Sequence, residues 1–149
     1  MTYREEVRDL FSTPDDYYLA HCISADFALG AGIAVEFNKR FDMKRKLISQ
    51  CGGNYLSAWD SHFEETIPCI QEGRVFNLIT KRNYWHKPTY ETLEDALIAL
   101  KCLCCGDIDK LAMPVIGCGL DRLQWDKVSE IIKDVFDDTD IEILVCKLK

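Results

Sequence analysis

No apolar run in the 149-residue chain approaches the ~20 residues that a membrane-spanning helix requires. The first six residues, MTYREE, include three charged side chains and no apolar segment of the signal-peptide type. From these two absences we expect a protein that makes no membrane contact and stays in the compartment where it is made. That compartment is the cytoplasm or, in a eukaryotic cell, also the nucleus.

A second absence concerns metal ligands. The chain has eight cysteines, but the cluster of Cys102, Cys104 and Cys105 is not matched by a second Cys/His pair at zinc-finger spacing. Other cysteines, such as Cys22 and Cys146, lie in or beside apolar runs, where a reduced thiol behaves as a small hydrophobic side chain. We therefore expect free thiols in a reducing compartment, with no bound metal and no cofactor.

The chain also lacks the positive charge that a broad grip on nucleic acid needs. Its formal net charge is −7, which opposes sequence-independent binding to a phosphate backbone. A small phosphate-bearing ligand is still compatible with this charge, because backbone dipoles can hold it locally. Nearly half of the residues are hydrophobic, and the length suits one domain, residues 1–149, which we expect to be monomeric.

Hydrophobic periodicity predicts strands that alternate with amphipathic helices. The expected strands cover residues 17–24, 66–70, 74–80, 111–115 and 141–145, with a turn at residues 71–73. The expected helices cover residues 33–41, 43–51, 90–105 and 125–136, the third capped by Thr89. This alternation is typical of a layered α/β fold with a largely parallel sheet.

Three expected loops have unusual chemistry: residues 24–32, 81–89 and 116–122. In parallel α/β folds, ligands bind outside the carboxyl ends of the strands. Because each of these loops follows an expected strand, we expect them to meet at one edge of the sheet.

Two of these loops contain closely spaced glycines, Gly30-Ala31-Gly32 and Gly117-Cys118-Gly119. Such a loop before a helix can direct backbone N–H groups at an anion, and the helix N-terminus adds partial positive charge. The full GxGxxG dinucleotide fingerprint is absent, and each glycine pair alone could simply permit a tight turn. Two such loops in one small domain favour a diphosphate site.

A lysine and an aspartate in these loops are candidate catalytic residues. Lys81 ends an apolar strand, where most lysines are solvated, but one held against apolar surface can act as a neutral nucleophile or base. Asp121 could cap the helix that follows it. A carboxylate beside an anion site is electrostatically unfavourable, however, so a catalytic Lys81–Asp121 pair explains its position better.

Other chemically active side chains have simpler interpretations. We expect His21 to be a hydrogen-bonded core residue. His86 could contact a ligand, but we do not assign it as a base. Tyr84 and Trp85 could either stack on a ligand ring or anchor their loop in the core. Cys118 has no assigned basic partner, so its thiol should remain protonated and unreactive.

Taken together, these motifs resemble the macrodomain family, specifically its terminal ADP-ribose protein glycohydrolase branch, also called O-acetyl-ADP-ribose deacetylase. The matching blocks occur in the family's order and cover most of the chain outside residues 41–70: LAHCIS from Leu19, GAGIAV from Gly30, LITK from Leu78, HKPTY from His86, and MPVIGCGLDRLQW from Met113.

The resemblance implies a three-layer α/β/α macrodomain with a mixed, largely parallel sheet and a cleft for ADP-ribose. It implies that Asp9 contacts the adenine, although Arg8 stands where the family usually has glycine. It also implies that Lys81 is the nucleophile and Asp121 the catalytic acid and base. The remaining ligand-binding positions implied are Ser24, Gly30, Ala31, Gly32, Ile33, Thr80, Pro114, Ile116, Gly117, Cys118, Gly119 and Leu120.

The implied reaction is attack of the Lys81 amine on the anomeric carbon of the distal ribose, which releases the carboxylate of a modified Glu or Asp. The expected substrates are therefore ADP-ribosylated protein and O-acetyl-ADP-ribose. Two alternatives remain at this stage: hydrolysis of ADP-ribose linked to DNA bases, and non-catalytic binding of ADP-ribose. A pure binding module needs the glycine loops but not the Lys–Asp pair.

Overall fold

A computed structural model describes residues 1–52, 55–61, 67–119 and 121–148. Over these residues the elements follow in the order β1 (Thr2–Val7), the short 3-10 helix η1 (Leu10–Ser12), β2 (Tyr18–Ser24), α1 (Ile33–Phe41), α2 (Met43–Cys51), α3 (Tyr55–Ser61), β3 (Cys69–Glu72), β4 (Val75–Lys81), α4 (Tyr90–Leu103), β5 (Lys110–Met113), α5 (Trp125–Phe136) and β6 (Glu142–Lys147).

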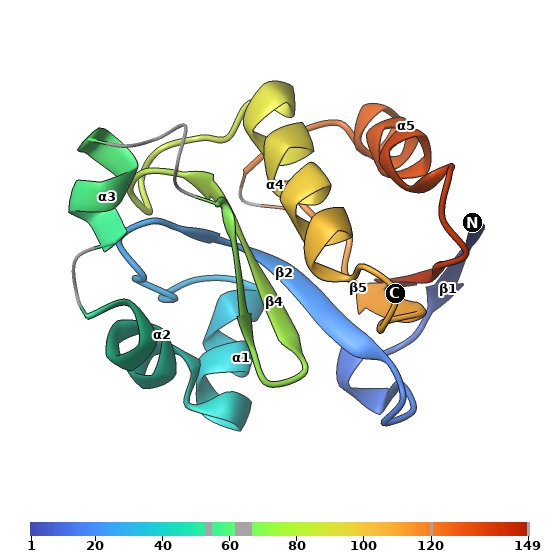
Figure 1. Ribbon diagram of the computed structural model, residues 1–149, viewed down its shortest axis with the longest axis horizontal. Helices are drawn as coiled ribbons and strands as arrows, with labels where there is room; N and C mark the ends of the chain where they lie inside the picture. The colour runs from blue at the N-terminus through green and yellow to red at the C-terminus, as the bar shows by residue number, and fades with distance from the viewer. Residues whose placement is uncertain (53–54, 62–66, 120, 149) are drawn as a thin grey trace.

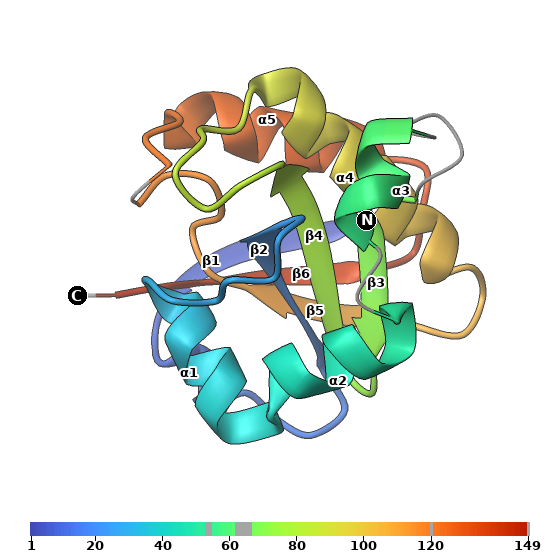
Figure 2. The same cartoon turned by 90° about the vertical axis from the view of Figure 1, so that its left-hand side faces the viewer.

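The strands form one six-stranded sheet in the order β1-β6-β5-β2-β4-β3. Every neighbouring pair is parallel except β3 and β4. Helices α4 and α5 lie on one side of the sheet, and α1 and α2 lie on the other (Figures 1 and 2). The three-layer α/β/α arrangement with a mixed, largely parallel sheet is confirmed.

Strand β4 shows how the sheet divides the core. Phe76 and Leu78 are fully buried against residues of α4 and α5, whereas Val75 and Ile79 belong to the cluster that includes α1 and α2. Adjacent side chains of a strand point to opposite faces, and both faces here are covered by helices. This explains why the strand reads as a continuous apolar run and why the chain can carry Lys81 rigidly at its end.

Local signals place most helix ends where the sequence predicts them. Helices α1, α2 and α5 match the expected ranges, and Gly52 ends α2 in the left-handed conformation with φ 65°. Thr89 caps α4 through a reciprocal capping box with Thr92. Helix α4 ends at Leu103, two residues before the predicted end.

The predicted strand ends need several corrections. The first hairpin strand is β3, Cys69–Glu72, and residue 66 of the predicted strand lies outside the described residues. Glu72 pairs with Val75, so the turn is Gly73-Arg74, with Gly73 at φ 60°, rather than residues 71–73. Strand β5 ends at Met113 because Pro114 has no N–H for the ladder. Strand β6 extends two residues beyond the predicted end.

Strand β1, η1 and α3 were not predicted at all. Strand β1 is an edge strand with the sequence TYREEV, most of it exposed, and it pairs in parallel with β6 along its whole length.

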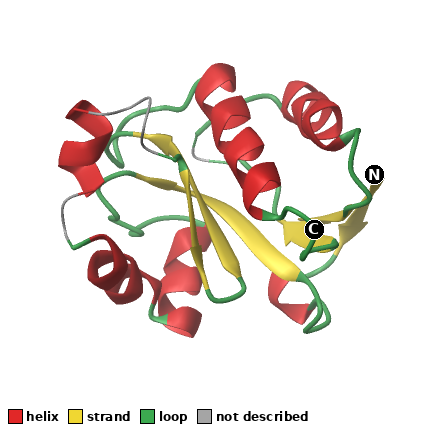
Figure 3. Ribbon diagram, in the orientation of Figure 1, coloured by secondary structure: helices red, strands yellow, loops and turns green. Residues whose placement is uncertain are grey.

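All eight cysteines have free thiols. None of the helices in the described part of the chain has the length and apolar character needed to cross a bilayer. The loops that connect these elements are drawn in green in Figure 3.

Candidate active site

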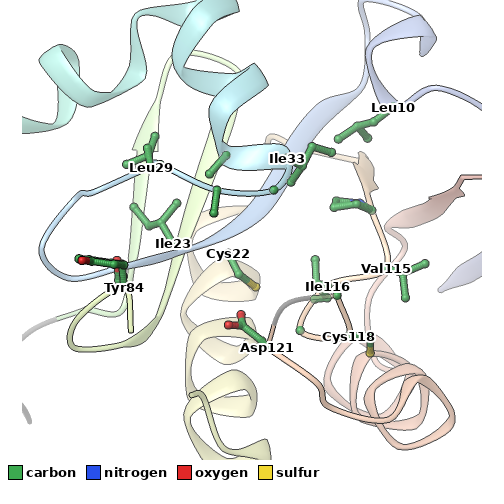
Figure 4. Close-up of a pocket in the computed structure, with 18 of the residues that line it drawn as sticks. Leu10, Cys22, Ile23, Leu29, Ile33, Tyr84, Val115, Ile116, Cys118 and Asp121 are labelled. Atoms are coloured by element: carbon green, nitrogen blue, oxygen red, sulfur yellow. The ribbon is translucent and has the colours of Figure 1, made fainter. Parts of the chain in front are cut away.

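A cavity of about 830 Å³ opens where β2, β4 and β5 end. Its wall comes from the loops after these three strands and from the segment between β1 and η1. Figure 4 shows side chains from these separate segments arranged around one space. The three chemically unusual loops therefore meet at one edge of the sheet, as predicted. The volume lies within the range of small-molecule binding sites.

Lys81 and Asp121 lie together in this wall. The Lys81 Nζ donates a hydrogen bond to Asp121 Oδ1 at 2.6 Å, and only 14% and 16% of the two side chains are exposed. Lys81 is therefore not a solvated strand end. Asp121 does not cap the next helix, since Gln124 is the N-cap of α5. Arg82 is directed away from this pair and forms a two-point ion pair with Asp60.

The loop after β5 folds back on itself through Gly117. Its carbonyl accepts a hydrogen bond from Leu123 N at 2.8 Å, and its φ of 74° is in the left-handed region. A Cβ at this position would lie 3.1 Å from Leu123 Cδ1. Both constraints favour glycine. The tight turn brings Gly119 and Asp121 back to the cavity wall.

The loop after β2 places the N-terminus of α1 at the cavity. Gly32 is the N-cap, with φ 61° and no side-chain cap, and residues 28–34 line the wall. The N–H groups of a helix's first turn have no intrahelical acceptor. Together with the helix dipole they form a site that attracts an anion.

Asp26 joins the loop after β2 to the loop after β4. Its Oδ1 accepts hydrogen bonds from Ser24 Oγ at 2.5 Å and Ala28 N at 3.2 Å, and its Oδ2 accepts one from Tyr84 N at 3.1 Å. Burial raises the pKa of this carboxyl, but the hydrogen bonds outweigh that effect and hold the pKa below its ordinary value. The Asp26 carboxylate therefore links the loop after β2 to the loop after β4 through hydrogen bonds.

The opposite end of the cavity is lined by Arg8, Asp9 and Leu10. Asp9 caps η1, where its Oδ1 accepts a hydrogen bond from Phe11 N at 3.0 Å. The Arg8 guanidinium donates to the carbonyl and hydroxyl oxygens of Ser12. Arg8 in place of the expected glycine thus adds a cation to this end of the wall, held by the 3-10 turn.

The three thiols in the wall, Cys22, Cys118 and Cys146, are poor nucleophiles, because burial raises the pKa of each. Burial raises the pKa of Cys118 to about 11, with a smaller contribution from Asp126. Burial also raises the pKa of Cys22, and the charge of Asp121 adds to that effect. Figure 4 shows the sulfur of Cys22 directed toward the Asp121 carboxylate. All three thiols are therefore protonated near neutral pH, as expected from the sequence for Cys118.

The structure brings nearly all predicted site residues into the cavity wall: Asp9, Ser24, Gly30, Ala31, Gly32, Ile33, Lys81, Pro114, Ile116, Gly117, Cys118, Gly119 and Asp121. Thr80 does not line the cavity and is 1% exposed, because strand alternation puts it on the side of Phe76 and Leu78, beneath α4. Leu120 lies outside the described residues.

The structure confirms His21 as a hydrogen-bonded core residue and places His86 outside the cavity wall. His21 is fully buried, stacks on Phe37 with ring centroids 3.7 Å apart, and lies 2.6 Å from Asn77 Oδ1 through its Nε2. His86 is absent from the cavity wall, and its Nδ1 accepts a hydrogen bond from Asn83 N. Within the described ranges, no group of three or more Cys, His, Asp or Glu residues is arranged to hold a metal ion.

The aromatic residues of the same loop are not core anchors. Tyr84 and Trp85 are 63% and 62% exposed, and of these two only Tyr84 lines the cavity.

Sequence reasoning missed Asp26 as a site residue. The one local signal was a hydroxyl residue two positions before an aspartate, a pattern typical of turns.

A central mixed sheet between two helical layers, with a cavity at the carboxyl ends of its strands, is the fold of solved macrodomains. The macrodomain of Thermus aquaticus DarG superposes with a TM-score of 0.77 at 22% identity, covering 97% of both chains. The structure of Thermosipho africanus DarTG in complex with ADP-ribose superposes with a TM-score of 0.68 at 16% identity, covering 98% of this chain and 41% of that one.

Sequence comparison places the chain more narrowly. No protein-family profile matches it. Human ADP-ribose glycohydrolase OARD1, however, is 45% identical over 142 residues, which cover 94% of this chain and 88% of the human protein. The chain therefore belongs to the ADP-ribose glycohydrolase OARD1 family of macrodomains.

Proposed function

We propose that this protein is an ADP-ribosyl hydrolase that cleaves ester linkages between ADP-ribose and carboxylates. Its substrates are proteins ADP-ribosylated on Glu or Asp, and O-acetyl-ADP-ribose. The observation that carries this proposal is the Lys81–Asp121 pair, enclosed in the same cavity wall as two glycine loops. A module that only binds ADP-ribose needs the loops and has no use for an enclosed amine–carboxylate pair.

The arrangement of the wall supports one orientation of the ligand. The diphosphate lies between the N-terminus of α1 and the loop at Gly117, where backbone N–H groups and the helix dipole favour negative charge. The distal ribose then lies at Lys81 and Asp121. The adenosine extends to the opposite end of the cavity, beside Arg8 and Asp9.

The proposed reaction uses the two side chains in sequence. The neutral amine of Lys81 attacks the anomeric carbon, a C–N bond forms, and the C–O bond to the carboxylate breaks with its electron pair leaving on oxygen. Asp121 accepts a proton from the attacking amine. A water oxygen then bonds the anomeric carbon as the C–N bond breaks. Asp121 returns its proton to the lysine nitrogen and accepts the proton that the water loses, and ADP-ribose is released.

The test is a single-turnover assay with excess enzyme. We expect release of free ADP-ribose from a peptide ADP-ribosylated on one glutamate and from O-acetyl-ADP-ribose. Tight binding of both substrates without release would instead assign the protein as a binding module. Release from ADP-ribosylated single-stranded DNA, with neither ester substrate cleaved, would contradict the proposed linkage.

A further inference from the structure

Two exposed aromatic side chains lie in the loop that follows Lys81. Tyr84 and Trp85 are each more than 60% exposed, and their rings meet edge to face with centroids 5.0 Å apart. Trp59 and Trp125, the other two tryptophans of the chain, pack against the two core clusters. Trp85 therefore differs from both in presenting its indole to solvent, which leaves a large apolar surface uncovered.

This aromatic pair is held in place by its backbone. Asp26 accepts a hydrogen bond from Tyr84 N, and His86 N donates to the Asn83 carbonyl at 3.0 Å. The Trp85 ring also contacts His86, with ring centroids 5.4 Å apart. The loop therefore presents the two rings from a position fixed relative to Lys81, three residues before Tyr84. Preorganised aromatic side chains of this kind are typical of binding surfaces.

We propose that Tyr84 and Trp85 bind the polypeptide that carries the ADP-ribosyl ester, by contacting an apolar side chain next to the modified residue. The proposal rests on the proposed function. If the scissile bond lies at Lys81, the modified Glu or Asp and its flanking residues must leave the cavity at this end. Tyr84 lines the cavity here, and Trp85 continues the surface outward.

Charge favours a polypeptide over a nucleic acid as the occupant. The phosphates of a nucleic acid require several cations that can be brought to them. Of the two cations that follow Lys81 in this loop, Arg82 is held by both carboxylate oxygens of Asp60 at 2.7 Å, so Lys87 alone adds a positive charge to the cavity wall. The net charge of the chain is −7. Aromatic rings can also stack on bases, so the test includes a DNA substrate.

The experiment compares a substrate that has a polypeptide with one that does not. The probes are a peptide ADP-ribosylated on one glutamate flanked by leucines, and O-acetyl-ADP-ribose. For Trp85→Ala we expect kcat/KM on the peptide to fall by about tenfold, mainly through KM, as expected for loss of an interface tryptophan. Turnover of O-acetyl-ADP-ribose should be unchanged.

Matched variants separate this effect from general loss of apolar surface. Ile98 is an exposed apolar residue of α4, 45% exposed and outside the cavity wall. Ile98→Ala should leave both substrates unaffected, and Trp85→Phe should retain most of the activity on the peptide. Equal effects of Trp85→Ala on both substrates, or none on either, would overturn the proposal, as would a larger loss on ADP-ribosylated single-stranded DNA than on the peptide.

Equilibrium binding keeps this proposal distinguishable from the proposed function. The comparison is made between Lys81→Ala and the double variant that also has Trp85→Ala. Calorimetry should show that the added Trp85→Ala lowers the affinity for the ADP-ribosylated peptide, while the affinity for free ADP-ribose stays the same. If the unaltered protein hydrolyses neither substrate, the proposed function fails, and this difference in affinity still decides the role of Trp85. Equal affinities for the peptide with and without Trp85→Ala would refute that role.

Discussion

Two lysine–aspartate ion pairs lie at opposite edges of the same sheet, one where the strands end and the other where they begin. Lys81 ends β4 and bonds Asp121 at 2.6 Å, while Lys110 begins β5 and bonds Asp16 at 2.7 Å. The atoms and distances are nearly the same, but the surroundings differ. The first pair is 14% and 16% exposed inside a cavity wall, and the second is 36% and 57% exposed outside it.

The comparison shows that a short Lys–Asp contact says little about catalysis by itself. The side chains become a candidate reaction centre where the carboxyl ends of parallel strands, two glycine loops and a helix N-terminus meet around them. Besides Asp16, Lys110 has the ring of Tyr17 5.5 Å from its Nζ and the charge of Glu142 acting on it, and it lies outside the cavity wall. An exposed pair of this kind contributes about 0–1 kcal/mol to stability.

The largest expected difference between the two edges is in catalysis. Lys81→Ala should lower the single-turnover rate on an ADP-ribosylated peptide by at least about 10³-fold, because it removes the proposed nucleophile. Its affinity for ADP-ribose, measured by calorimetry, should remain largely intact. Lys110→Ala removes an equivalent ion pair and should leave the rate unchanged. Wild-type turnover by Lys81→Ala would rule out the proposed mechanism.

The carboxylates should differ in the same way. Asp121→Asn keeps the size of the side chain but cannot take up a proton, so we expect a rate loss of about 10²–10³-fold, within the range for a general acid–base group. Asp16→Asn is the matched change at the other edge and should have no effect. Equal rates for the two variants would show that Asp121 serves only to hold Lys81.

Acid should lower the stability of the whole sheet, and so affect both edges together. The reason is that β2, which lies between β4 and β5, carries the buried His21. Burial lowers the pKa of His21 to about 4, although the hydrogen bond to Asn77 opposes this. The unfolded chain therefore takes up a proton first, near pH 6.5. The contribution of the neutral His21 to the free energy of unfolding is fully present above pH 6.5, and it falls by roughly 3 kcal/mol as the pH drops to about 4.

Urea unfolding at several pH values between 7 and 4 would measure this loss, and the ring resonances of His21 should show no titration in the folded protein above pH 5. Titration of this ring near pH 6.5 would contradict the prediction. The result also sets the pH for the kinetic comparison, because rates of variants at the proposed catalytic pair are best compared above pH 6.5, where the fold retains its full stability.

Local patterns and long-range contacts explain what sequence could predict. The ranges of α1, α2 and α5 follow from apolar periodicity and end signals such as Gly52, which act within a few residues. Strand β1 has no apolar alternation, and its conformation depends on pairing with β6, more than 130 positions away along the chain. Such a strand is not visible in its own residues.

The same distinction applies to the site. Lys81 and Asp121 could be predicted to meet because each follows a strand whose carboxyl end faces the same edge. The role of Asp26 depends on a hydrogen bond to Tyr84, 58 residues later, and the two loops carry no pattern that specifies it. The exposure of Trp85 likewise follows from the course of a loop and not from its composition.

Asp26 provides the smallest and most specific test of why the two edges differ. Two of the side-chain interactions that hold the loop after β4 form a matched pair: the partly buried Asp26 bonds and the exposed Arg82–Asp60 pair, whose side chains are 40% and 45% exposed. If the hydrogen bonds of Asp26 position Lys81, Asp26→Ala should lower kcat by about tenfold, since a small misplacement of a reacting group is costly. Asp60→Ala should change kcat by less than about twofold, as expected for an exposed pair.

The split between kinetic constants separates positioning from general damage. Asp26→Ala should lower kcat with little change in the affinity for ADP-ribose, because the glycine loops that hold the diphosphate remain. Asp26→Asn keeps one acceptor oxygen and should have an intermediate rate. A parallel loss of affinity and of thermal stability in Asp26→Ala would mean that this carboxylate supports the fold as a whole. In that case the order of the catalytic edge would come from the strand ends alone.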